Sequence, residues 1–134
     1  MGSLSAADAV PVAEFRAALR GFLRTSERNS RAAGLTPQRY LLLLMIKGAP
    51  DQSEQSTVTE LADRLQLAQS TVTELVSRAE EIGLVERERS SDDGRIALLR
   101  LTPEGEQRLA KSFTSNAAER NALRQAFAHL DIVA

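Results

Sequence analysis

Two short stretches of the chain carry side chains whose types and spacing could do chemistry. The first holds Gln69, Ser70, Thr71 and Thr73, a run of short polar residues that opens an amphipathic segment. Glutamine fits the edge of adenine and a threonine methyl can touch that of thymine, so such a run at the start of a helix suits the major groove of DNA. Alternatively, these hydroxyls only cap the helix and solvate its face.

The second stretch is a polar loop between two apolar runs, with Arg87, Arg89 and Arg95 on it or beside it. An arginine at the tip of such a loop can enter a narrow minor groove, where the negative potential is strongest. Asp93 can hold the Arg95 guanidinium in one orientation. A solvated charged loop is the alternative. The neighbouring Asp92 and Asp93 lack the further ligands that a metal site needs.

Composition narrows the function classes. The chain has 134 residues, 43% hydrophobic and 26% charged, as expected of one globular domain. It has no cysteine and one histidine, His129, which excludes disulfides and thiolate zinc sites. No nucleophile with a base, paired carboxylates or phosphate-binding glycine loop is evident, so we expect neither an enzyme nor a cofactor.

Charge and hydropathy bear on partners and location. The net charge of −1 runs against a nucleic-acid partner, although phosphates respond to local charge within about one Debye length, roughly 8–10 Å. The longest apolar run, Tyr40–Ile46, is far shorter than the roughly 20 residues that span a bilayer. With no signal peptide apparent, we expect a cytoplasmic protein without a membrane partner.

Apolar periodicity and end signals predict the elements of the first half. Helical spacing of apolar residues predicts a helix over 8–32 that ends near Gly34. Thr36 and Pro37 predict the start of a second helix, to Lys47, buried on nearly all sides over 40–46; a buried strand is the alternative there. Residues 51–56 are expected to form a loop with a short strand.

The second half contains a capping box at Thr57–Glu60, which predicts a short helix, followed by a helix over about 69–82 that ends at Gly83. The expected buried face of the second helix holds Val72, Leu75, Val76, Ala79 and Ile82. Two strands, Leu84–Arg89 and Ile96–Leu101, should form a hairpin around the Ser, Asp and Gly residues of 90–95. Helices are expected over 103–112 and 117–130.

This order of elements predicts a mainly α fold with a small β-hairpin, a winged helix-turn-helix within residues 57–101. Its motifs resemble those of the MarR family of transcription regulators, in register over about 35–110. They are Leu35-Thr36-Pro37-Gln38, Val58-Thr59-Glu60-Leu61-Ala62-Asp63-Arg64-Leu65, Ser70-Thr71-Val72-Thr73, Gly83-Leu84-Val85-Glu86-Arg87, Asp93-Gly94-Arg95 and Leu101-Thr102-Pro103-Glu104-Gly105.

The resemblance implies a division into N-terminal dimerisation helix (1–34), winged helix-turn-helix (35–101) and C-terminal dimerisation helices (102–134). It implies a homodimer on double-stranded DNA at a pseudo-palindromic operator, repressing transcription until a small aromatic or acidic effector binds. Carried over by position, the recognition-helix contacts are Gln69, Ser70, Thr71, Thr73 and Arg78, and the wing contributes Asp93 and Arg95.

Two positions depart from the family pattern. Glu74 stands where members commonly carry arginine, and Gly94 replaces an arginine of the wing. Fewer positive charges predict weaker non-specific binding and a shallower salt dependence. The net charge and Glu74 favour one alternative, a winged-helix module that binds protein rather than DNA. The absence of cysteine excludes the peroxide sensing of some relatives, and a single histidine argues against zinc sensing.

Overall fold

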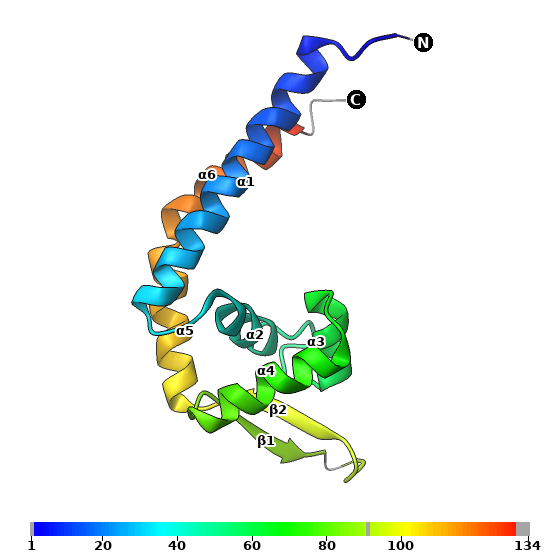
Figure 1. The fold of residues 1–134 in the computed structure, drawn as a ribbon, viewed down its shortest axis with the longest axis vertical. Helices are drawn as coiled ribbons and strands as arrows, with labels where there is room; N and C mark the ends of the chain where they lie inside the picture. The colour runs from blue at the N-terminus through cyan, green and yellow to red at the C-terminus, as the bar shows by residue number, and fades with distance from the viewer. Residues whose placement is uncertain (1, 91, 131–134) are drawn as a thin grey trace.

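The computed structural model describes residues 2–90 and 92–130. Ser91 of the predicted hairpin loop and residues 131–134 of the predicted C-terminal region lie outside the described residues. Figure 1 shows an elongated molecule in which a pair of long helices extends from a smaller body that ends in a hairpin. The elements in order are α1 (Ala6–Ala32), α2 (Pro37–Lys47), α3 (Val58–Leu65), α4 (Gln69–Glu81), β1 (Val85–Arg89), β2 (Ala97–Leu101), α5 (Pro103–Ser115) and α6 (Ala117–Leu130).

Side-chain caps and glycines fix most of the helix ends. Thr36 and Thr102 each accept a hydrogen bond from a backbone N–H three residues on, and a proline follows each of them at the first helical position. Thr57 and Glu60 form the predicted capping box, with N···O distances of 2.9 and 3.1 Å. Gly34 and Gly83 follow α1 and α4 with φ of +79° and +77°, which glycine adopts readily.

Residues 35–101, which we call the winged domain, enclose the core. Leu42, Leu43 and Ile46 of α2 are fully buried, as are Leu61 of α3 and Val72 of α4. The hairpin closes this core through an antiparallel register that pairs Val85 with Leu101 and Arg89 with Ala97. Ser56 exchanges two backbone hydrogen bonds with Leu99, which confirms a short extended segment before α3. The predicted winged helix-turn-helix is therefore confirmed, in this mainly helical fold.

Helices α1 and α6, which we call the arm, pack side by side in opposite directions away from the winged domain (Figure 1). Phe15 and Phe127 meet edge to face with ring centroids 6.0 Å apart. Even so, several large apolar residues of α1 and α6 stay about half exposed, among them Val12 (47%), Leu23 (49%) and Phe127 (58%). The arm thus has an apolar surface that the described residues leave uncovered. No helix of the described residues has the length and hydropathy to span a membrane.

Helix α5 contacts both the end of α1 and the winged domain, in each case at backbone carbonyl groups. The Arg108 guanidinium donates to the Gly34 carbonyl at 3.0 Å, and Lys111 Nζ donates to the Ala32 carbonyl at 3.3 Å. Both cations therefore lie at the C-terminus of α1, where the helix dipole favours positive charge. A Cβ on Gly105 would lie 2.2 Å from the Leu84 carbonyl oxygen, so only glycine allows this approach.

Four details differ from the sequence expectations. Ile82, predicted on the buried face of α4, is 45% exposed because α4 ends at Glu81 and the chain turns at Gly83. The strands begin one residue later than predicted, and α5 continues to Ser115. The stretch 40–46 is helical, so the alternative of a buried strand is wrong. Its burial is also less complete than predicted, because Leu41 is 42% exposed on the outer side of α2.

Candidate nucleic-acid interface

The N-terminal end of α4 presents polar side chains to solvent. The helix buries Val72, Val76 and Ala79 against the core, which turns the intervening positions outward. The predicted contact residues of its first turns are all exposed: Gln69, Ser70, Thr71 and Thr73. No side chain of the described residues caps this helix, so the first-turn N–H groups are left to solvent or a ligand. This end of α4 can therefore meet a polar partner directly.

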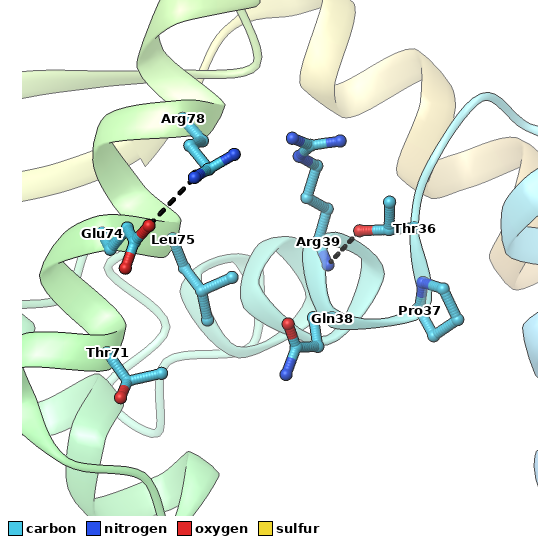
Figure 2. Close-up of a pocket in the computed structure, with 8 residues that line it drawn as sticks. All are labelled: Thr36, Pro37, Gln38, Arg39, Thr71, Glu74, Leu75 and Arg78. Atoms are coloured by element: carbon cyan, nitrogen blue, oxygen red, sulfur yellow. Dashed lines mark hydrogen bonds and ion pairs between the residues drawn. The ribbon is translucent and has the colours of Figure 1, made fainter.

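Arg78 lies one turn further along α4 and is paired within the helix. Its guanidinium Nη2 lies 3.0 Å from Glu74 Oε1, in an i,i+4 pair in which both side chains are more than half exposed (Figure 2). Such exposed pairs add little to stability, about 0.3–0.5 kcal/mol, so a stronger partner can displace one member. Arg78 is thus available at the surface, with a carboxylate holding it in the unbound protein.

The end of the hairpin presents Arg95 as an almost fully exposed cation. The Arg95 side chain is 93% exposed, and its Nε lies 3.5 Å from Asp93 Oδ1. The same carboxylate oxygen accepts the Arg95 backbone N–H at 3.0 Å, which fixes the turn. The predicted Asp93–Arg95 contact therefore exists, and it leaves the guanidinium pointing into open solvent.

The other two arginines of the hairpin are engaged within the protein. Arg87 Nε donates to Glu80 Oε1 at 2.8 Å, which ties β1 to α4. Arg89 donates to the Gly94 carbonyl and holds the loop against the strand. Both side chains therefore position the hairpin, whereas Arg95 extends from it.

A cleft beside α4 adds residues that the sequence did not single out. It has a volume of about 480 Å³ and lies between the first turn of α2 and the middle of α4. Figure 2 shows Arg39 of α2 and Arg78 of α4 extending into the same gap. Only the fold brings Arg39 next to α4, since the two arginines are far apart in sequence. Its position in the first turn of the helix that begins at Thr36-Pro37 was the available signal in the sequence.

We also searched the described residues for a metal site and for clusters of charged side chains away from α4. Across 2–90 and 92–130, no three or more His, Asp or Glu side chains gather as a metal site would require. Lys47 lies between Glu54 and Glu106, with Nζ···O distances of 2.7 and 2.9 Å, and both carboxylates raise its pKa. In turn, Lys47 lowers the pKa of Glu54. This group ties the loop after α2 to α5 at a distance from the polar end of α4.

A short helix, a turn, a second helix with an exposed polar face and a hairpin with an arginine at its end define a winged helix-turn-helix DNA-binding fold. Residues 33–96 match the model of the MarR family. The resemblance found in the sequence is thereby confirmed as a similarity: the matched residues, just under half of the chain, are similar to the MarR family of transcription regulators. No curated protein matches the chain.

Solved structures of MarR regulators share the fold. AbsC, a MarR family transcriptional regulator from Streptomyces coelicolor, is 21% identical, with a TM-score of 0.69 over 100% of this chain and 86% of its own. A mutant MarR from E. coli complexed with operator DNA is 20% identical, with a TM-score of 0.66 over 81% and 75%. The PcaV regulator from Streptomyces coelicolor, in complex with its natural ligand, is 30% identical, with a TM-score of 0.54 over 64% and 58%.

Proposed function

We propose that this protein is a homodimeric, sequence-specific DNA-binding repressor that acts at a pseudo-palindromic operator. The observation that carries the proposal is the exposed, uncapped first turn of α4 together with Arg95 on the hairpin. One presents hydrogen-bonding groups for base edges, and the other presents a cation for the backbone or minor groove. The similar E. coli structure holds operator DNA, which supports this class of partner.

The proposed contact residues divide by role. We assign base reading to Gln69, Ser70, Thr71 and Thr73, because their side chains are short and lie at the end of α4. We assign phosphate or groove contacts to Arg78 and Arg95, with Asp93 orienting the latter. Arg87 and Arg89 support the hairpin through hydrogen bonds within the protein. To contact DNA, either side chain would have to break its internal hydrogen bond and form one with DNA.

The second copy of the chain is proposed to cover the arm. A cleft of about 430 Å³ lies on α1 and α6, lined by the apolar residues Phe15, Phe22, Leu123 and Phe127 beside Arg120 and Arg124. A soluble protein rarely leaves such a contiguous apolar surface open. A symmetric dimer through residues 1–34 and 102–134 would place the two α4 helices on successive turns of one DNA face, about 34–36 Å apart.

An effector would act between the arm and the winged domain. The similarity to PcaV, which was solved with its natural ligand, supports a small-molecule effector, and we propose an aromatic or acidic one. A cavity of only about 70 Å³ lies there, between Leu23 and Ser30 of α1 and Tyr40 of α2. Because ligand pockets usually hold about 300–1,000 Å³, an effector at this place must separate the two regions. That movement would change how the two α4 helices are spaced.

A mobility shift on the DNA upstream of the protein's own gene, at low and moderate salt, tests the proposal. We expect the wild type to retard this DNA and Arg95→Ala to bind more weakly whatever the sequence. Gln69→Ala and Thr73→Ala should instead change which half-site is preferred. Arg20→Ala, which removes the same charge from the exposed side of α1, is the matched control once sedimentation shows that it dimerises as the wild type does.

The outcomes separate the proposal from its alternative. If a folded dimer shifts no upstream fragment, DNA binding is wrong, and a protein-binding winged helix becomes the better account of the acidic side chains on α4. If the wild type binds but Arg95→Ala binds equally well at physiological salt, only the assignment of the hairpin is wrong. A stable monomer in sedimentation would contradict the dimer.

A further inference from the structure

Glu74 occupies a place on α4 where a side chain of a recognition helix meets base edges. It follows Ser70 by four residues, which places the two about 40° apart around an ideal helix axis. Both are exposed, and Glu74 retains 67% of its side-chain surface. Figure 2 shows Glu74 and Thr71 on neighbouring turns of α4, where both line the cleft beside α2. Glu74 therefore lies one turn C-terminal to Ser70, on the same exposed side of α4.

The base edges of the major groove accept a carboxylate unequally. An ionised carboxylate only accepts hydrogen bonds. Guanine presents two acceptors there, and thymine an acceptor and a methyl group. Adenine presents a donor beside an acceptor, which suits an amide better than a carboxylate. Cytosine alone presents its N4 amino group without a neighbouring acceptor.

From these facts we propose that Glu74 is a specificity-determining residue that reads a cytosine in each half-site. The proposal rests on the proposed DNA-binding function and deepens it. Arg78 supports the geometry, because its guanidinium lies 3.0 Å from the Glu74 carboxylate and holds the side chain over the exposed face of α4. The same guanidinium can donate to a guanine nearby, as arginine commonly does.

The Glu74 charge also works against binding at unselected sequences. A carboxylate near the phosphate backbone is repelled at every site, and only a site with the correct amino group offsets that repulsion. Glu74 would therefore lower non-specific affinity and raise the ratio of specific to non-specific binding. This accounts for an acidic residue in the N-terminal half of α4, where the other exposed residues are Gln69, Ser70, Thr71 and Thr73.

Selection of bound sequences from a randomised duplex library, with the full-length protein, tests the proposal. Wild type should select a cytosine at symmetric positions of its two half-sites. Glu74→Ala should lose that preference, and Glu74→Gln should move it to adenine, because an amide matches the adenine edge. Titration of the selected site against one with that cytosine replaced should show a difference of about 5-fold or more for wild type, and less for Glu74→Ala.

Glu81→Gln is the matched control, because it removes the same charge from the exposed C-terminal end of the same helix. It should keep the selected cytosine. If wild type selects a DNA sequence and Glu74→Ala and Glu74→Gln select the same one, the role of Glu74 is overturned and the DNA-binding function stands. If wild type selects no sequence at all while folded and dimeric, the proposed function is overturned, and this role of Glu74 with it.

Discussion

The winged domain and the arm differ in how far one chain can bury its own apolar residues. In the winged domain, Leu42, Leu43 and Ile46 of a single helix are fully buried. In the arm, the described part of α6 has no buried residue, and in α1 the buried residues are the serines Ser26 and Ser30. Apolar burial is the dominant favourable term in folding, so we expect the packed core of the winged domain to contribute most of the stability of one chain, and the arm to gain stability from a further surface.

The difference follows from the shape of each region. Helix α2 contacts five other elements, α1, α3, α4, α5 and β2, and these cover most of its seven successive apolar residues. In the arm, two helices contact each other along one line, and each keeps an apolar stripe facing outward. Stability in the arm is therefore expected to depend on protein concentration, and stability in the winged domain is not.

The largest expected effect is in the winged domain. Leu43→Ala should lower the free energy of unfolding by about 2–5 kcal/mol, because it leaves a cavity in a fully packed core. Chemical denaturation at several protein concentrations would measure it. Leu41→Ala, at a neighbouring position that is 42% exposed, should cost much less. Equal losses for the two variants would contradict the packing described for α2.

The next effect lies where the two regions join. Gly105→Ala should lower the free energy of unfolding by about 1–3 kcal/mol, because the new methyl group collides with the Leu84 carbonyl. Gly94→Ala is the control, since a Cβ there meets no atom of the described residues within 4 Å. Thermal unfolding of both variants would show the difference. A Gly105→Ala protein as stable as wild type would mean that α5 does not approach the end of α4 so closely.

Phe127→Ala tests the arm directly. It removes the edge-to-face pair with Phe15, worth about 0.5–1.5 kcal/mol, together with apolar area that a second chain would cover. Self-association measured by sedimentation equilibrium should weaken, and the melting temperature should become more dependent on concentration. Ile96→Ala, which truncates a comparably exposed apolar residue on the hairpin, should leave self-association unchanged. The opposite pattern would place the dimer interface on the winged domain.

The smallest effect is expected from Glu54. Lys47 lowers the pKa of this carboxyl, so its contribution to stability is present above the ordinary glutamate pKa and is lost as pH falls through the lowered value. The stability difference between wild type and Glu54→Gln should therefore shrink on acidification. Denaturation at neutral and acidic pH would measure it, with Glu14→Gln on α1 as the control. A difference that grows in acid would contradict the ion pair.

The elements could be predicted from the sequence because their ends are determined locally. Thr36, Thr57 and Thr102 cap helices through backbone groups only three residues away, and Gly34 and Gly83 end helices by their own conformation. The error at Ile82 has the opposite cause: the apolar periodicity was extended one residue past Glu81, where the helix has already ended. Only the three-dimensional fold shows that Gly105 lies against Leu84.

The residues of the candidate interface could be predicted from the sequence, but the contacts that its arginines make within the protein could not. The exposed first turn of α4 and the Asp93–Arg95 contact follow from periodicity and short spacing. The engagement of Arg87 by Glu80 depends on how β1 returns along α4, which no local pattern fixes. The same holds for Arg39, which reaches α4 only through the packing of α2.

The most direct test of the central claim is sedimentation of the protein with a labelled DNA duplex carrying its selected site, at moderate salt. We expect two chains to bind one site, and Arg95→Ala to shift the binding curve to higher protein concentration while the stoichiometry stays the same. A folded protein that leaves this DNA free at every concentration would contradict the account.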